Sequence, residues 1–221
     1  MIDRMKLRTK IAALVIAALL GLISMVVLSA IQVKRDLLDG RQKVIQSVLE
    51  GVISTVSTYQ AQEAAGKITR EEAQKAAAEA IGMVRYGGDD GKSEYVYAFT
   101  TEGVGIYHIK KERIGQNMLE KIKDSQGNYT WKDIIATAKQ NPGGAFQITL
   151  TARPGEKKTV EKLGYVKLYE PWSWVIGTGV YVDDIDAEFE SRLVSNLAIA
   201  GVLIVLIGGL GFVIARGVLR Q

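Results

Sequence analysis

The stretch of sequence that decides the fold is Pro171-Trp172-Ser173-Trp174-Val175-Ile176-Gly177-Thr178-Gly179-Val180-Tyr181-Val182-Asp183-Asp184. Residues 174–182 are mostly β-branched or aromatic, which predicts a strand. Pro171-Trp172-Ser173 predicts a turn before that strand. Asp183 and Asp184 suit the start of a helix, because carboxylates there accept hydrogen bonds from free N–H groups. A strand that runs directly into a helix is therefore expected.

The predicted helix continues into an apolar block. Residues 197–215 carry no charged side chain, and neither do residues 11–31. At about 1.5 Å per residue, either block is long enough for the core of a bilayer. A cleaved signal peptide is the alternative for the first block, with Leu28-Ser29-Ala30 as a loose cleavage site, but its apolar region is usually shorter. We predict membrane helices at residues 11–33 and 193–215.

The distribution of charge predicts the topology. The 221 residues carry a net charge of +4, but residues 1–10 and 216–221 hold six basic side chains against one acidic one, Asp3. The rest of the chain has 22 basic and 23 acidic side chains. Basic flanks stay on the cytoplasmic side, so both ends are predicted inside the cell's inner (plasma) membrane, with residues 34–192 periplasmic or extracellular. The basic surplus reflects this topology, and no nucleic-acid partner is expected.

The external segment predicts one α+β domain. Residues 34–62 read as a long helix, with valines every four positions from Val44. Thr69 and Glu72 form a capping-box pattern for a second helix that ends near Val84. Strands are expected at residues 95–100, 104–109, 146–151, 163–169 and 174–182, a short helix at 131–139, and a hairpin tip at 153–160. The prediction is a five-stranded antiparallel sheet after two helices, held between two transmembrane helices.

Several kinds of chemistry are excluded by composition. The chain has no cysteine and a single histidine, His108, so disulfides, thiolate metal sites and two-imidazole metal sites are excluded. Neither a phosphate-binding Gly-x-x-x-x-Gly-Lys loop nor a Gly-x-Ser-x-Gly elbow is present. Asp89-Asp90 suits either a calcium site or a solvated turn, and Asp183-Asp184-x-Asp186 either a cation site or a helix cap. We expect no enzyme, no metal and no cofactor.

Small residues recur in both membrane blocks. Ala13, Ala17 and Gly21 make a stripe in the first, which suits dimerisation or is ordinary membrane-helix composition. Gly208, Gly209 and Gly211 in the second favour close helix packing.

A polar-aromatic group of residues points to binding. Tyr95 and Tyr97 alternate with apolar neighbours and share a sheet face, as do Ile106 and His108 on the partner strand. Tyr165, Lys167 and Tyr169 also share one face. Such faces offer phenol, imidazole and ammonium donors to an anion, although an ordinary amphipathic sheet would show the same alternation.

The chain resembles the single-Cache sensor modules (second type) of bacterial methyl-accepting chemotaxis proteins, together with their two flanking membrane helices. The resemblance is carried by the runs Leu7–Lys10, Ala65–Ala73, Arg85–Gly87, Tyr95–Tyr97, Gly115–Asn117, Asp124–Gly127, Lys162–Lys167 and Glu170–Asp186. It implies a long helix and a PAS-like five-stranded sheet with a small-molecule pocket. It also implies a HAMP relay after Gln221 and a signal carried by the second membrane helix. We expect the chain to form a homodimer. Two positions depart from the family pattern: Glu94 replaces the usual glycine, and Ile109 follows the histidine in place of proline.

The implied ligand is a short carboxylate such as acetate, propionate, pyruvate or lactate. A carboxylate that leaves water needs charge-assisted hydrogen bonds. Arg85 is expected to provide them, with Lys162 or Lys167 as a second cation, and Arg85→Ala is expected to abolish binding without unfolding the domain. The expected ligand-binding residues are Arg85, Tyr95, Tyr97, His108, Trp131 as an apolar lid, Lys162, Tyr165 and Lys167. The alternatives are the same module serving a histidine kinase or cyclase, a membrane-anchored enzyme, and a ligand-free adaptor.

Overall fold

A computed structural model describes residues 7–88, 91–124, 126–153, 156 and 158–218 of the chain. The chain divides into two compact units. One unit joins the N-terminal part, through Leu38, to the C-terminal part from Asp184, and the other comprises Asp39–Asp183. Two long helices, α1 (Leu7–Ala64) and α4 (Asp183–Val218), each belong to both units.

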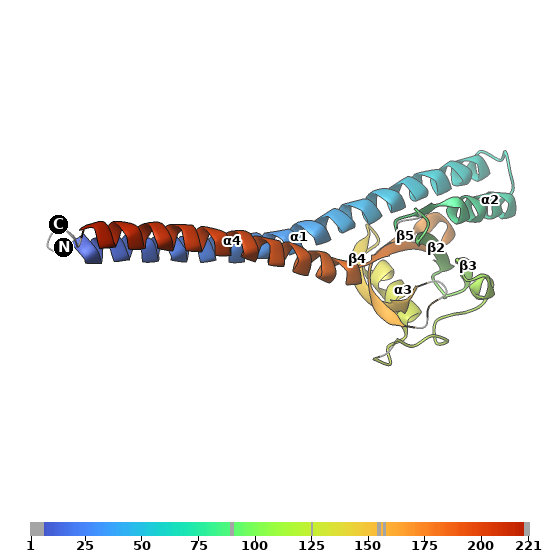
Figure 1. Cartoon of the computed structure of the whole chain (residues 1–221). Coiled ribbons are helices and arrows are strands. Elements are labelled where there is room, and N and C mark those ends of the chain that lie inside the picture. The colour runs from blue at the N-terminus through green and yellow to red at the C-terminus, as the bar shows by residue number, and fades with distance from the viewer. Residues whose placement is uncertain (1–6, 89–90, 125, 154–155, 157, 219–221) are drawn as a thin grey trace. The chain divides into compact units, whose positions relative to one another are not determined.

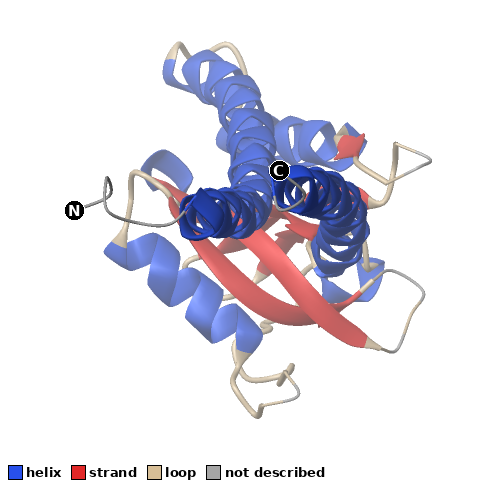
Figure 2. Cartoon of the chain, turned by 60° about the vertical axis from the view of Figure 1, so that its left-hand side comes forward, coloured by secondary structure: helices blue, strands red, loops and turns tan. Residues whose placement is uncertain are grey.

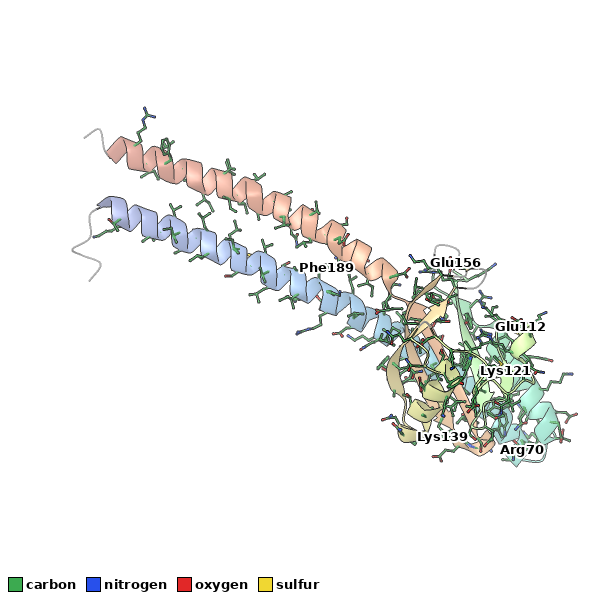
Figure 3. The ribbon with its side chains drawn as sticks, turned by 90° about the horizontal axis from the view of Figure 1, so that it is seen from below. Arg70, Glu112, Lys121, Lys139, Glu156 and Phe189 are labelled. Carbon is green, nitrogen blue, oxygen red and sulfur yellow. The ribbon has the colours of Figure 1, made fainter. Side chains whose placement is uncertain are left out.

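In the first unit α1 and α4 run antiparallel, side by side (Figure 1). Asn196 Nδ2 donates to Ser29 Oγ at 3.5 Å, and a Cβ added to Gly211 would lie 2.8 Å from Val15 Cγ2. The prediction that glycine here permits close helix packing is confirmed at Gly211. Figure 3 labels Phe189 on α4, whose ring centroid lies 5.8 Å from Lys34 Nζ. Both helices are long and apolar enough to cross a membrane, and their large apolar side chains are mostly exposed, as lipid-facing side chains would be.

The second unit begins with the remainder of α1 and with α2 (Arg70–Met83). In α1, Ile45, Leu49, Val52 and Val56 are buried at helical spacing, whereas Val44, the first valine of the predicted pattern, is 49% exposed. The capping box at Thr69 and Glu72 is present with both of its hydrogen bonds. In α2, the buried side chains are those of Ala73, Ala77 and Ile81, so small residues let this helix pack closely.

The sheet, whose strands are red in Figure 2, is antiparallel throughout. The strand order is β1-β2-β6-β5-β4, with β3 paired to β2. The strands are β1 (Arg85–Tyr86), β2 (Glu94–Thr100), β3 (Gly105–Tyr107), β4 (Ala145–Ala152), β5 (Thr159–Tyr169) and β6 (Trp174–Tyr181). The five predicted strands are all present. The two-residue β1 was not predicted, and β3 is shorter than the predicted 104–109.

The connections bring three short helices. α3 (Thr130–Gln140) matches the helix predicted at 131–139. A 3₁₀ helix, η2 (Lys111–Arg113), follows β3, and another, η3 (Glu170–Trp172), precedes β6. The turn predicted at Pro171–Ser173 ends with Ser173 at φ 52°, in the left-handed region. The helix predicted to begin at Asp183 does begin there.

The two faces of the sheet are covered differently. α3 packs against one face, where Tyr97, Phe99, Val166 and Val175 form a buried core with Trp131. The pairs Tyr97–Gly177 and Val166–Gly177 place Tyr97 and Val166 on that same face. Side chains alternate along β5, so Tyr165 and Lys167 lie on the opposite face.

Candidate functional site

Four of the predicted site residues meet on the α3 face of the sheet. Tyr95 and Tyr97 come from β2, His108 from just after β3, and Trp131 from the first turn of α3. The ring centroids of Tyr95 and His108 are 5.2 Å apart, those of His108 and Trp131 5.6 Å, and those of Tyr97 and Trp131 5.1 Å, all edge to face. We call Tyr95, Tyr97, Phe99, His108 and Trp131 the ring cluster. Of these residues, the alternation along β2 predicted that Tyr95 and Tyr97 share a face, and Phe99 was not predicted.

The imidazole of His108 is neutral. It is only 1% exposed, and burial, followed by the nearby charges of Arg113 and Lys162, lowers its pKa to about 2. The backbone N–H of Lys110 donates to Nδ1 at 2.9 Å, so Nδ1 carries the lone pair. In a neutral imidazole the proton is then on Nε2.

Arg113 was not predicted, yet it faces this proton directly. It ends η2, on the segment between β3 and α3 where Figure 3 labels Glu112 and Lys121. Its Nη1 lies 3.1 Å from His108 Nε2, and its guanidinium carbon lies 5.8 Å from the centroid of the Trp131 ring. In this tautomer two N–H groups face each other at a separation that admits no atom between them, so an anion would accept a hydrogen bond from both once the Arg113 side chain moves aside. The sequence offered little to distinguish Arg113 from the other charges of residues 110–113.

Lys162 joins the ring cluster from β5, but it is paired. Its Nζ lies 3.2 Å from Glu94 Oε2, and 4.4 Å from the ring centroids of both Tyr95 and Tyr181. Lys162 and Glu94 are each 5% exposed. Burial lowers the pKa of Lys162, and the carboxylate of Glu94 opposes that shift. The other oxygen of Glu94, Oε1, accepts the backbone N–H of Tyr181 at 3.3 Å.

Arg85 lies at the edge of the site, with its guanidinium bonded to the backbone. Its Nε donates to the carbonyl of Glu94 at 3.1 Å, and its Nη2 donates to the carbonyl of Lys92. These bonds hold the start of β2 to the loop before it. The ligand-binding role expected for Arg85 from the sequence stays untested, and because two carbonyls already occupy its guanidinium, the ligand is proposed below to bind Arg113 instead.

Tyr165 and Lys167 are not brought to the ring cluster. The Tyr165 ring lies 4.6 Å from that of Phe146, and its hydroxyl donates to the carbonyl of Gly143 at 3.5 Å. The expectation that Tyr165 and Lys167 share a surface with Tyr95 and Tyr97 is wrong in placement, because the register of β5 turns them to the other face. Because side chains alternate between the two faces along β5, Lys162 lies on the α3 face instead.

The phenols of the site remain protonated. Burial raises the pKa of Tyr95 to about 12 and raises the pKa of Tyr97 further, since the phenolate would be poorly solvated. Both therefore act as O–H donors. Their hydroxyls and the two N–H groups at His108 and Arg113 give the site an excess of donors, which suits an anionic ligand.

Two cavities among the described residues of the second unit lie away from the ring cluster. One, of about 280 Å³, lies between α1 and α2 beside Gly51, Thr55 and Ile81. Another, of about 240 Å³, is lined by Asp124, Asp133, Glu161 and neighbouring polar residues along β4 and β5. The rings of the cluster contact one another directly, so a ligand would have to displace part of their cover. The Asp89-Asp90 pair falls outside the described residues, and so do the side chains of Asp184 and Asp186.

Comparison with known proteins places these features in a family. The family model of Single Cache domain 2 matches residues 37–194. The chain is 30% identical over 217 residues to the methyl-accepting chemotaxis protein McpP of Pseudomonas putida, covering 98% of this chain and 39% of that protein. It is 35% identical over 101 residues to the sensor histidine kinase MctS of Rhizobium johnstonii, covering 45% of this chain and 21% of the kinase. The chain thus spans well under half the length of both relatives.

Solved structures agree with the family match. One, described as the structural basis for carboxylic acid recognition by a Cache chemosensory domain, superposes with a TM-score of 0.61 at 31% identity, over 67% of this chain and 98% of that one. Another, the periplasmic sensor domain of a chemotaxis protein, superposes with a TM-score of 0.60 at 30% identity, over 66% of this chain and 98% of that one. The long helix, the antiparallel sheet and the family match lead to one conclusion: the chain belongs to the Single Cache domain 2 family.

Proposed function

We propose that this chain is the input module of a transmembrane chemoreceptor that binds a short carboxylate outside the membrane and signals through α4. The observation that carries the proposal is the pair of donors at His108 Nε2 and Arg113 Nη1, 3.1 Å apart. A carboxylate that bridges the two groups, with the Arg113 side chain displaced to admit it, would relieve the repulsion of two N–H groups and gain two hydrogen bonds, one of them charge-assisted. A solved relative is described as recognising carboxylic acids, which supports the same ligand class.

The ligand is short because its surroundings are aromatic and closely packed. The ring centroids of Phe99 and Trp131 are only 4.0 Å apart, and Tyr97 closes the same side of the cluster. Acids with one to three carbons, such as acetate, propionate, pyruvate or lactate, would disturb this packing least. Tyr95 and Tyr97 would add hydroxyl donors, with Trp131 as the apolar cover.

A connection from the site to α4 runs through Tyr181. Its ring contacts Lys162 on one hand and Arg153 on the other, with the Arg153 guanidinium carbon 4.5 Å from the ring centroid. Arg153 in turn holds Asp183, the first residue of α4, through two hydrogen bonds of 2.8 and 2.7 Å. Ligand binding would shift the population between two arrangements of these contacts and thereby move α4.

A second candidate is the same module as the input of a sensor histidine kinase, which the match to MctS favours. The output domain in the complete protein distinguishes the two, since ligand recognition would be identical in both. We place the module in the inner membrane with both ends in the cytoplasm, on the basis of its basic flanks.

The test is a thermal-shift titration of the detergent-solubilised chain with acetate, propionate, pyruvate and lactate. A true ligand at a hundredfold excess over its Kd stabilises the folded state by about 2.7 kcal/mol. We expect Arg113→Met to abolish the shift. The matched variant Arg85→Met should retain it, since the Arg85 donors are bonded to backbone carbonyls. If the ligand-induced thermal shift persists in Arg113→Met and is lost in Arg85→Met, the ligand binds at Arg85 and the proposed position at Arg113 is wrong.

A further inference from the structure

We propose that Glu94 is a specificity-determining residue, whose carboxylate holds Lys162 and so restricts the site to acids that carry a single negative charge. The inference rests on the proposed function, because it concerns the same ligand. It differs from that function in assigning a role to a protein carboxylate at the edge of the site, where the family pattern usually has glycine.

The Glu94–Lys162 pair is built into the fold. Both side chains are almost fully buried, at 6% and 7% exposure, with Nζ and Oε2 separated by 3.2 Å. Glu94 is fixed further by the N–H of Tyr181, which donates to Oε1. Gly87, at φ +64°, leaves room for it, because a Cβ there would lie 2.8 Å from Glu94 Cγ. Such a pair is maintained because either charge alone would be buried without compensation.

The three cations around Tyr95 therefore differ in what they offer a ligand. Arg85 donates to two backbone carbonyls, and Lys162 is held by Glu94. Among the residues that the structure describes, Arg113 has no carboxylate within ion-pair distance, and its Nη1 faces another donor. The site thus offers an incoming carboxylate one uncompensated cation, Arg113, which would move aside from His108 to let the carboxylate bridge the two donors.

A second carboxylate on the ligand would meet Glu94. His108 and Lys162 both contact the ring of Tyr95, at 5.2 and 4.4 Å from its centroid, and the charge of Lys162 reaches His108 strongly enough to lower the pKa of the imidazole. A diacid bound at Arg113 would bring its second charge toward Lys162, where Glu94 already sits. Like charges in a buried site repel strongly, so diacids are rejected.

The experiment compares pairs of acids that differ by one carboxylate. Propionate and succinate form one pair and lactate and malate the other, each measured by titration calorimetry on the solubilised full chain. The wild type should bind a monoacid and reject its diacid partner. Glu94→Gln, which keeps the shape and removes the charge, should raise diacid affinity at least about tenfold relative to the monoacid. The double variant Glu94→Gln with Lys162→Met should lose that gain and still bind the monoacid.

Each outcome decides the question. A wild type that binds none of the four acids contradicts the proposed function itself. A wild type that binds a monoacid while Glu94→Gln keeps the same monoacid-to-diacid ratio overturns only the role of Glu94. If the gain in diacid affinity persists in the double variant, the role of Glu94 is also overturned, because Lys162 would then not be the cation that binds the second carboxylate. Glu94→Gln could also melt at a lower temperature than the wild type. In that case the diacid should raise the melting temperature of the variant more than the monoacid does, because the second carboxylate of the diacid replaces the missing charge. Equal increases with the two acids contradict the proposal.

Discussion

At the scale of single residues, the candidate site depends on which side-chain nitrogens carry a proton and can therefore donate a hydrogen bond. His108 is the only histidine of the chain and is kept neutral by burial and by three nearby cations, Arg113, Lys162 and Lys110. Its N–H at Nε2 and the guanidinium of Arg113 are both donors, so their contact is poor without an anion between them. An acid-base group held in one state is a good binding group, because its hydrogen-bonding role stays constant across physiological pH.

The neutrality of His108 predicts a pH-dependent stability. Its pKa is lowered in the folded state to about 2 from an ordinary value of 6.5. Between these values the unfolded chain binds a proton that the folded chain does not, so stability falls as pH falls below about 6.5. The slope is about 1.4 kcal/mol per pH unit, or roughly 2 kcal/mol between pH 7 and pH 5.

Urea denaturation of the solubilised chain at pH 7, 6 and 5 measures this slope. Carboxylates contribute little in that window because they remain ionised in the unfolded chain. His108→Gln is the control and should flatten the dependence above pH 5. A slope unchanged in His108→Gln would show that the imidazole is not the titrating group.

At the scale of elements, the ends of helices and hairpins decide how the site is held. The capping box at Thr69 starts α2, which supports β2 from the face opposite α3. Arg153, after β4, binds the first residue of α4 through its guanidinium and lowers the pKa of Asp183. The capping box is local in sequence, whereas the contact of Arg153 with Asp183 joins residues 30 positions apart.

For the cap, we expect Thr69→Ala to lower the free energy of unfolding by about 1 kcal/mol, since Glu72 N loses its hydroxyl acceptor. Chemical denaturation measures the change. Thr58→Ala on the exposed side of α1 is the matched control, because its hydroxyl only donates to the carbonyl of Ser54 within the helix. If the two variants change the free energy of unfolding equally, the hydroxyl of Thr69 contributes no more to stability than an ordinary exposed hydroxyl on a helix.

For the Arg153–Asp183 pair, we expect a coupling free energy below about 1 kcal/mol, since the side chains are 30% and 38% exposed. A double-mutant cycle with Arg153→Met and Asp183→Asn measures it. The same variants should weaken signalling more than stability, because the contact joins the sheet to α4. Normal ligand-dependent output in both variants would remove the pair from the signalling route.

At the scale of the whole molecule, the chain combines a Cache unit with two helices able to cross a membrane. The antiparallel pair of α1 and α4 is closely packed at Val15 and Gly211 and again at Ser29 and Asn196. Any signal leaving the Cache unit through α4 would have to change this packing. Homodimerisation, which the small-residue stripe from Ala13 suggested, stays a prediction.

Disulfide crosslinking tests the membrane pair directly, because the natural chain has no cysteine. Ser29→Cys with Asn196→Cys should crosslink within one chain in membranes, and a ligand should change the rate if α4 moves by about 1–2 Å. Leu14→Cys with Val205→Cys is the control, since both side chains are exposed at 72%. Identical rates with and without a ligand that binds would count against movement of α4.

Much of this architecture could be predicted from the sequence, because local rules govern it. Hydrophobic blocks predicted the two long helices, the Thr69–Glu72 spacing predicted a cap, and alternation predicted the five main strands and the shared face of Tyr95 and Tyr97. Tyr95, Tyr97, His108 and Trp131 do meet, and Lys162 joins them; local alternation predicted the first two, the resemblance supplied Trp131 and Lys162, and their binding of a ligand stays a prediction.

What the sequence by itself determined is the set of elements and the periodicity of each, since these depend on neighbours three or four positions away at most. Only the tertiary structure decided which face of β5 meets β2, because the register is set by pairing with β6 and not by β5 itself. That register turned Lys162 toward the site and Tyr165 and Lys167 away from it. Chain folding also brought Arg113 to His108 and Glu94 to Lys162. The first contact depends on the irregular backbone between β3 and α3, and the second joins side chains of two strands far apart in the sequence, so no spacing rule covers either.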